Sequence, residues 1–447
     1  MKKQSSKLIS LILAIFMLIT AFSGCGSNTS ADTGNTAKAS AAEASGAQEE
    51  QEPVTLQYWY QGTDKATQVE MEEYVKAFEE KNPGIKVEAT GMSPVISEQE
   101  TKLNAAVLSG TYPDVIHIVL AEVGTRGSLN DFEPLDSYIE KWADKDDIFE
   151  SAYEMGKYAG KQVAIGCAPN PNIFVYRKDL FREAGLDPEK PPKTWKELEA
   201  VVDKLTKKDN KGNVIQAGFD LPSVDSSLVF TEPFMRSNGS MIIDEQNLKP
   251  SFTDKGAIEA LQFLGDLAAK KDYIAHDQQK GDEKPFMNKK SAIGNIGVNQ
   301  VAQFKENNPD LADQLGYLTM FSNDDKPAVG FCGYQLYAMG ETSGHKEEAW
   351  KLMQYMLSKE IIQDRSVKKL FPPIRKSLEE DYIQKDPALN SVVMEYVKNG
   401  KGKATVPWIS VYNKYVSNSY EVVINQKGSA EKALKDAEIA LLKEISK

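Results

Sequence analysis

The feature that most constrains the fold is a regular alternation of strand and helix patterns that begins at residue 54. Val54 to Tyr60 places Val54, Leu56, Tyr58 and Tyr60 on one face, which is the two-residue period of a strand. A stripe of apolar residues at helical spacing follows and stops before Asn82-Pro83-Gly84. The same order continues with a strand over Ile85 to Ala89, a helix over Glu98 to Ser109 and a strand over Asp114 to Val119. The alternation predicts an α/β fold with a largely parallel sheet.

The middle and the end of the chain continue this alternation. Two short strands, Val163 to Ile165 and Ile173 to Tyr176, are expected on either side of Ala168-Pro169-Asn170-Pro171. Thr194 and Glu197 have the spacing of a capping box that opens a helix. Further amphipathic helices are expected over Asp254 to Lys270, His345 to Ser358 and Ser429 to Ile445. About 395 residues exceed one ordinary core, so two lobes are predicted.

The N-terminal segment up to Gly24 has the pattern of an export signal. Three lysines precede an apolar run from Leu8 to Phe22, and Ser23 and Gly24 stand immediately before Cys25. The run is shorter than the roughly 20 residues that a membrane-spanning helix needs. We therefore predict a cleaved signal peptide over residues 1–24, with a retained membrane anchor as the weaker alternative.

The segment after Cys25 has the composition of a linker. Gly26 to Glu52 contains no aromatic residue and no Val, Ile, Leu or Met. Such a composition cannot bury a core, so residues 25–52 are expected to form a disordered tether. The tether favours anchoring at Cys25 over an ordinary cleavage site that happens to lie near a cysteine.

Charge and cysteine usage exclude several classes of protein. The formal net charge is −12, which makes nucleic acid and anionic lipid poor partners. Besides Cys25 there are only Cys167 and Cys332, without metal-ligand spacing. Two buried, unreactive thiols are the favoured interpretation, and no metal or cofactor is expected.

Catalytic motifs are missing from the sequence. His117, His276 and His345 are widely separated, and there is no nucleotide-binding loop, metalloprotease motif or serine-hydrolase elbow. With 65 acidic residues, carboxylate pairs suited to glycoside hydrolysis arise by chance. The sequence therefore predicts a protein that is not an enzyme, and a structural role is the simpler reading of His117.

Several segments together resemble a known family. From about Val54 onward the chain resembles the extracellular solute-binding proteins of family 1, the group that contains maltose-binding protein and serves ABC importers. Residues 22–25 resemble the lipobox of bacterial lipoproteins, in which the cysteine is lipidated. The family resemblance depends on segments 78–87, 108–115, 176–186, 192–198 and 238–240, whereas Cys332-Gly333 departs from the Gly-Gly that is more frequent in the family.

The resemblance implies a two-lobe fold with a ligand cleft between lobes that are joined by crossing strands. The crossings are expected near Ala168 to Pro171, Val329 to Cys332 and Pro372 to Ile374. The first lobe would then comprise segments 53–168 and 332–373, and the second lobe segments 171–330 and 374–447. This placement would bring Cys167 and Cys332 beside adjacent strands, which keeps a disulfide bridge between them open as a minority hypothesis.

The resemblance also implies a partner and a location. The expected function is capture of a small-molecule ligand and its delivery to the membrane subunits of an ABC permease. The protein would be a monomer held at the extracellular face of the cell membrane by a lipid anchor, in a bacterium of the Gram-positive type.

Candidate ligand residues follow from where strands end. A doubly wound sheet binds its ligand beyond the carboxyl ends of its strands. In the first lobe these ends offer Trp59, Tyr60, Gln61, Asp64 and the segment from His117 to Glu122. The second lobe and the crossings offer Asn170, Asn172, Glu232, Phe234, Arg236, Asn299, Tyr334 and Trp408.

These residue types suit a sugar. Aromatic rings cover the apolar faces of a pyranose, and carboxylates, amides and guanidinium groups pair with its hydroxyls. Only six arginines stand against 47 lysines, whereas binders of carboxylate or phosphate favour the planar arginine fork. Core packing remains the alternative for each aromatic and is accepted for Trp142, Trp195 and Trp350. Arg236 and Glu232 could instead pair with each other. Other solutes (an amino acid, a polyamine or an anion) and a lipid-anchored glycan-processing enzyme remain alternative functions.

Overall fold

The computed structural model describes residues 53–446. Cys25, the predicted signal peptide and the predicted linker lie outside the described residues. The alternation predicted from Val54 to Val119 is confirmed, because strands and helices follow each other there in the expected order. The first elements are β1 (Val54–Gln61), α1 (Lys65–Lys81), β2 (Ile85–Met92), α2 (Ile96–Ser109), β3 (Val115–Val119), α3 (Leu120–Ser128), α4 (Asp136–Glu140) and α5 (Glu150–Glu154).

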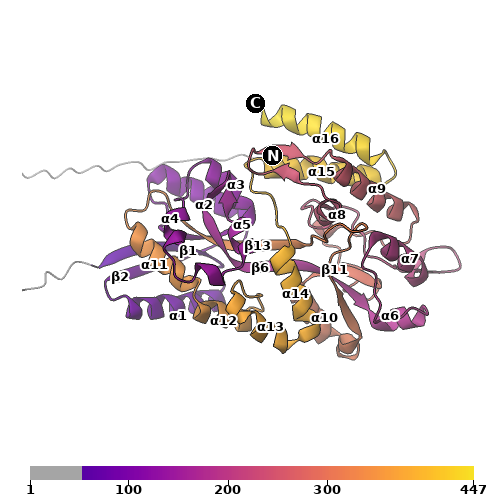
Figure 1. Cartoon of the computed structure of the whole chain (residues 1–447), viewed down its shortest axis with the longest axis horizontal. Helices are drawn as coiled ribbons and strands as arrows, with labels where there is room; N and C mark the ends of the chain where they lie inside the picture. The colour runs from indigo at the N-terminus through magenta and orange to yellow at the C-terminus, as the bar shows by residue number, and fades with distance from the viewer. Residues whose placement is uncertain (1–52, 447) are drawn as a thin grey trace, which may run out of the picture. The chain divides into compact units, whose positions relative to one another are not determined.

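One seven-stranded sheet runs through the described chain. The middle of the chain contributes β6 (Ala164–Arg177), β11 (Ile293–Gly297), β12 (Leu315–Leu318) and β13 (Phe331–Met339) to this sheet. β4 (Lys157–Tyr158) and β5 (Lys161–Gln162) form a separate two-stranded hairpin. The strand order is β11-β6-β13-β3-β1-β2, and β12 also pairs with β6. We call the part built around β1, β2 and β3 the first lobe, and the part built around β11 and β12 the second lobe. Figure 1 shows β6 and β13 running between them.

The expectation of a largely parallel sheet is wrong for most of these strands. β1 pairs parallel with β2 and β3, as βαβ connections require. β13 is antiparallel to β3 and to β6, and β11 and β12 are antiparallel to β6. The reason is that β6 and β13 carry the chain between the lobes in opposite directions.

The prediction of two short strands around Ala168-Pro169-Asn170-Pro171 is also wrong, because β6 replaces both. It is one strand of 14 residues that continues through both prolines. Proline has no backbone N–H and is tolerated where that position faces an unpaired edge. β11 pairs with β6 only from Asn172 to Tyr176. On the edge of β6 that faces away from β13, the two prolines therefore have no partner strand to which they would need to donate a hydrogen bond.

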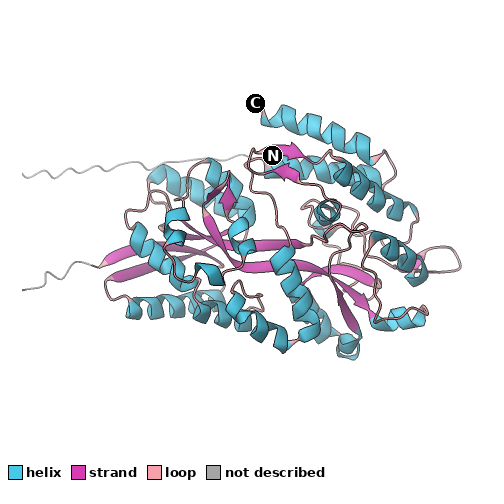
Figure 2. Cartoon of the chain, viewed as in Figure 1, coloured by secondary structure: helices cyan, strands magenta, loops and turns pink. Residues whose placement is uncertain are grey.

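The first lobe packs both faces of its sheet. Leu56, Tyr58 and Tyr60 are buried on the α1 side, where the Tyr58 hydroxyl contacts the Met71 sulfur at 3.8 Å. Trp59 points the other way, toward α2. Figure 2 shows helices flanking the strands of this lobe. The two faces of β1 therefore differ, with a core on one side and a half-buried tryptophan on the other.

The second lobe is built around an aromatic cluster. Its further elements are α6 (Lys178–Glu183), α7 (Trp195–Leu205), β7 (Lys207–Lys208), β8 (Val214–Gln216), α8 (Thr231–Ser237), β9 (Ile242–Asp244), β10 (Lys249–Ser251), α9 (Lys255–Ala269) and α10 (Val298–Asn307). The Phe174 ring of β6 lies 4.8 Å from that of Phe321 and 5.8 Å from that of Phe219. Such aromatic pairs contribute about 0.5–1.5 kcal/mol each beyond area burial. The capping box at Thr194 and Glu197 is formed, as predicted.

The last helices return to both lobes. They are α11 (Lys346–Met356), α12 (Lys359–Lys368), α13 (Glu379–Lys385), α14 (Pro387–Asn399), α15 (Ile409–Ile424) and α16 (Ala430–Ile445). α15 packs on α9 and α16, and α14 packs on β6 and β12. The helices predicted to start at Asp254, His345 and Ser429 all begin there, with those residues as N-caps.

The lobe boundaries and the third crossing remain predictions. After α12, the Ile374 carbonyl accepts a hydrogen bond from the Phe149 amide at 2.9 Å, so this residue is still held against α5 of the first lobe. The second lobe is contacted by Asp386, whose carboxylate lies 2.9 Å from Lys305 of α10. A third crossing would therefore end by Asp386.

The two cysteines are free and buried, as the favoured interpretation expected. Cys332 pairs with Pro171 in the β6–β13 ladder, whereas Cys167 lies near the Gln335 end, where its sulfur is 3.3 Å from the Gln335 carbonyl. The extended strand between these positions is longer than the roughly 7 Å between Cα atoms that a disulfide allows. The minority hypothesis of a bridge is therefore wrong.

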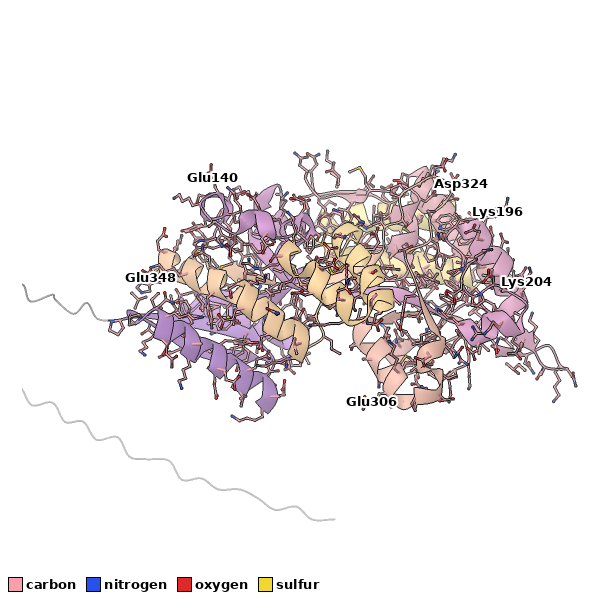
Figure 3. All side chains as sticks on the ribbon, turned by 60° about the horizontal axis from the view of Figure 1, so that its bottom comes forward. Glu140, Lys196, Lys204, Glu306, Asp324 and Glu348 are labelled. Carbon is pink, nitrogen blue, oxygen red and sulfur yellow. The ribbon has the colours of Figure 1, made fainter. Side chains whose placement is uncertain are left out.

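Charged side chains cover the outside of the described chain. Within residues 53–446, no helix combines the length and the apolar character needed to cross a bilayer. Figure 3 shows charged side chains projecting from the periphery of the ribbon, among them Glu140, Lys196, Lys204, Glu306, Asp324 and Glu348.

Candidate functional site

The two lobes touch along the segment from Gly402 to Val406. A Cβ on Gly124 of α3 would lie 2.5 Å from the Val406 backbone, and one on Gly402 would lie 2.2 Å from Leu120. The Lys401 amide donates to the Gly330 carbonyl beside the start of β13. The N-terminal half of α3, which follows the carboxyl end of β3, is therefore packed against a segment that leads into α15 of the second lobe.

Glu122 stands two residues before Gly124 in the chain, and its charged neighbours are Arg126 of α3 and Glu100 of α2. It lies in the first turn of α3 and is 2% exposed. Neither carboxyl oxygen has a hydrogen-bond partner among the described residues. Burial raises its pKa to about 7, although Arg126 one turn later opposes the shift. Glu122 is thus a buried acid without a hydrogen-bond partner among the described residues, and its place in a ligand site stays a prediction.

The other first-lobe residues divide between surface and core. The Trp59 ring is half-buried, with the Lys102 ammonium 4.2 Å from its centroid. Asp64 caps α1 by accepting from the Thr67 amide at 2.9 Å and from its hydroxyl, which lowers the pKa of Asp64. Tyr60 is 5% exposed and packs on Tyr58, so it belongs to the core.

His117 also lies in the interior and takes no part in the site that we propose below. It is 4% exposed, with its ring 4.9 Å from that of Tyr337 and its Nε2 3.5 Å from the Cys167 sulfur. Burial and the nearby Arg365 hold its pKa well below the usual value, so the ring is neutral. This environment supports the structural role for His117 that the sequence analysis preferred.

On the second lobe, a cluster of buried polar side chains lies on and beside α8. Glu232 is 3% exposed and its Oε2 lies 3.4 Å from Arg236, which realises the pairing left open by the sequence. Burial raises the pKa of Glu232, and the cations of Arg236 and Lys403 oppose it. Burial, together with the facing Glu232, raises the pKa of Tyr412, and the Arg236 Nε has no hydrogen-bond partner among the described residues. We call Glu232, Arg236, Lys403 and Tyr412 the α8 cluster.

Two asparagines of the second lobe meet at the end of β11. A Cβ on Gly297 would lie 2.7 Å from the Asn299 Oδ1 and 3.5 Å from the Asn172 Oδ1. A side chain at position 297 would displace the Asn299 amide from this junction between β11 and α10 and leave Asn172 in ordinary contact. Asn170, two positions before Asn172 on β6, is exposed. The structure therefore brings Asn172 and Asn299 together, as a pair of amides beside the crossing strand.

Trp408 and Tyr334 have different environments. Trp408 is half-buried immediately before α15, and its carbonyl accepts from the Tyr412 amide at 3.0 Å, which links it to the α8 cluster. Tyr334 is 4% exposed, and its hydroxyl lies 3.0 Å from the Ser151 hydroxyl and 3.3 Å from the Val397 carbonyl. Tyr334 is thus enclosed between α5 and α14. Phe234 is fully buried in the aromatic cluster.

Sequence reasoning missed Lys403 and Tyr412. A charged run such as Lys398 to Lys403 is typical of a solvated turn, but Lys403 does not follow that pattern. This lysine is half-buried beside Glu232 and Asp225, and burial lowers its pKa. No local pattern marks it, because the acids that face it lie far away in the sequence. Tyr412 sits on a helical stripe that looks like ordinary core.

The remaining chemistry of the site is simple. Within the described range, no group of three or more His, Cys, Asp or Glu side chains could hold a metal ion. Trp142, Trp195 and Trp350 are buried and lie in the core, as the sequence indicated. The candidate residues thus comprise a buried acid and a half-buried tryptophan on the first lobe, and the α8 cluster and a second half-buried tryptophan on the second lobe.

Comparison with known proteins places these features in context. The family model described as bacterial extracellular solute-binding protein matches residues 73–391. A binding protein of Brucella abortus (strain 2308) is 24% identical over 378 residues, which cover 82% of this chain and 87% of that protein.

Solved structures share the fold. The sugar-binding protein MalE of Xanthomonas citri matches with a TM-score of 0.75 at 20% identity, covering 88% of this chain and 98% of that one. An ABC substrate-binding protein of Listeria monocytogenes in complex with cycloalternan matches with a TM-score of 0.68 at 23% identity, covering 88% and 99%. The two-lobe α/β architecture is therefore that of periplasmic solute-binding proteins.

Proposed function

Because this chain belongs to the bacterial extracellular solute-binding proteins, we propose that it captures a neutral sugar or oligosaccharide between its lobes and delivers it to the permease of an ABC importer. Proteins of this family and fold act by binding. We therefore extend the proposal to a protein without catalytic activity of its own.

The observation that carries the ligand class is the set of unpaired polar groups on the two walls. Both Glu122 oxygens on the first lobe and the Arg236 Nε of the α8 cluster on the second are buried polar atoms that no described residue satisfies. A buried polar group without a partner costs about 1–3 kcal/mol, which a ligand hydroxyl would recover. A ligand rich in hydroxyls suits both walls, because each hydroxyl can donate and accept.

Two further features support a sugar. Trp59 and Trp408 are half-buried, so each can offer an aromatic face to the C–H face of a pyranose. Arg236, the only arginine of the proposed site, forms an ion pair with Glu232 at 3.4 Å, which neutralises charge that a carboxylate or phosphate ligand would need. Two structural neighbours are a sugar-binding protein and a complex with cycloalternan.

The proposed mechanism is closure about the crossing strands. A ligand that touches Glu122 and the α8 cluster at once is fully bound only when the lobes are closed, so binding shifts the hinge equilibrium toward that state. The permease would then recognise the closed surface. The alternatives are an amino acid, a polyamine or an anion as ligand, and a glycan-processing activity.

The proposal includes the place where capture happens. We propose that Cys25 is lipidated and tethers a monomer to the outer face of the cell membrane, in a bacterium of the Gram-positive type, which keeps the protein beside its permease. Replacing Cys25 by Ala should release the protein into the medium with its ligand affinity intact. Continued retention of the C25A variant at the membrane would contradict the anchor.

Thermal melting of the full-length protein against a ligand panel tests the function. A ligand at 100 times its dissociation constant stabilises a protein by about 2.7 kcal/mol. We expect stabilisation by at least one oligosaccharide, and not by amino acids, spermidine or phosphate. Stabilisation by one of these others alone would refute the sugar assignment, and release of product sugars would refute a purely binding role.

A matched pair of variants tests the site. Glu232→Gln removes a charge from the α8 cluster and should weaken binding of the stabilising sugar at least tenfold. Glu431→Gln makes the same change at the exposed start of α16 and should leave affinity unchanged. Equal affinities for the two variants would remove the α8 cluster from the site.

A further inference from the structure

The first lobe holds a cavity of about 590 Å³ outside the site described above. Its walls come from the C-terminal end of α2, the turn after α3, the β4–β5 hairpin and the loop after β13. None of the ligand residues expected from the sequence lines it. Because every wall belongs to the first lobe, filling this cavity requires no movement of the hinge.

Aromatic rings form much of the lining. Tyr112, Phe132 and Tyr158 all face the cavity. A Cβ on Gly127 would lie 2.6 Å from the Tyr158 ring, so this glycine lets the ring lie directly against the α3 backbone. A fixed ring is a preformed platform for a ligand with an apolar face, because little freedom is lost on binding.

The polar part of the lining is unsatisfied at one point. The Tyr112 hydroxyl is buried and has no hydrogen-bond partner among the described residues. Asp131 is neutralised by Arg126 at 3.2 Å, and exposed Lys161 and Glu341 carry opposite charges at the cavity. The cavity therefore combines an aromatic platform, an unpaired hydroxyl and little net charge.

We propose that this cavity is a second binding site, for a single neutral pyranose unit. Its volume lies within the roughly 300–1,000 Å³ typical of small-molecule sites. A pyranose stacks an apolar face on Tyr158, and a small shift of the Tyr112 ring brings its buried hydroxyl within reach of a sugar hydroxyl. A purely apolar guest would leave the Tyr112 hydroxyl unpaired, at a cost that the sugar avoids. The assignment rests on this lining and not on the function proposed for the site between the lobes.

Two neighbouring positions on α2 give a matched test. Val107 lines the cavity and is 45% exposed, whereas Leu108 is 89% exposed and does not line it. Val107→Trp should fill the cavity, and Leu108→Trp adds the same ring to the same helix outside it. Both changes are at exposed helix positions, which the fold tolerates.

The measurement is the binding stoichiometry of the full-length protein with methyl glucoside, methyl galactoside and methyl mannoside. Saturation-transfer NMR and calorimetry monitor the binding. We expect at least one of these to occupy two sites in the wild type and in Leu108→Trp, and one fewer in Val107→Trp. Tyr112→Phe should weaken the second site about fivefold, the effect of one hydrogen bond.

The outcomes separate this proposal from the proposed function. Glycoside binding that loses no site in Val107→Trp would overturn the cavity proposal alone. Loss of all binding in Glu232→Gln would do the same while supporting the site between the lobes. If Val107→Trp abolished all binding and Glu232→Gln changed none, the cavity would stand and the interlobe site would fall.

Discussion

Replacing Glu122 by Gln should stabilise the protein, and by an amount that grows with pH. Glu122 is 2% exposed and both of its oxygens lack partners among the described residues. Burial raises its pKa from 4.5 to about 7. A shift of this size corresponds to about 3 kcal/mol between the charged and neutral forms. The folded state therefore tolerates the neutral acid and resists the carboxylate.

The sign follows from proton linkage. Because the pKa is higher in the folded than in the unfolded state, the folded chain binds more protons between pH 4.5 and 7 and loses stability as the pH rises. Below pH 4.5 the acid is protonated in both states and the cost vanishes. Glu122→Gln, which mimics the protonated acid, should thus match the wild type near pH 4 and exceed it by about 3 kcal/mol at pH 8.

Urea unfolding of both proteins from pH 4 to pH 8, without ligand, measures this difference. Glu98→Gln is a suitable control, because Glu98 is an exposed acid in the first turn of α2. Its stability should stay within about 0.5 kcal/mol of the wild type at each pH. Stability curves for Glu122→Gln and wild type that run parallel from pH 4 to pH 8 would refute a buried, unpaired acid at this position.

Two glycine substitutions test the geometry of the site. Gly297→Ala should weaken ligand binding about tenfold, because its Cβ would lie 2.7 Å from the Asn299 Oδ1 and must displace that amide. Gly84→Ala, where a Cβ meets nothing within 4 Å, should leave affinity unchanged, and similar titration curves for both variants would argue against the asparagine pair. Gly124→Ala should favour an open state, because its Cβ would lie 2.5 Å from the Val406 backbone. We expect small-angle scattering to report a larger radius of gyration for this variant with ligand, and an unchanged radius would show that this contact does not limit closure.

Local patterns predicted local structure well. The strand at Val54, the helix caps at Asp254 and Ser429 and the capping box at Thr194 all depend on residues within a few positions of each other. The continuity of β6 was missed because its two prolines look like a break. Only the partner strands determine which edge those prolines face, and partners that lie far away in the sequence leave no local trace.

The site was harder to predict for the same reason. The alternation of β1 already placed Tyr60 on the face of Leu56 and Tyr58, so its burial could have been anticipated from the pattern. Lys403 could not, because its half-buried state depends on acids contributed by α8 and the loop before it. The end of a strand can be predicted from the sequence, whereas tertiary packing sets the direction of each side chain and placed candidates such as Tyr60 in the core.

The shared sheet has a consequence for how the chain folds. β3 and β13 are hydrogen-bonded neighbours although they lie far apart in the sequence, and β6 needs β11, β12 and β13 to complete its ladders. Pairing over such separations must overcome a large loop-closure entropy before any contact compensates for it, which makes folding slow. The first lobe cannot complete its sheet until most of the polypeptide is available. Slow folding of this kind is compatible with threading the unfolded chain through a translocation channel.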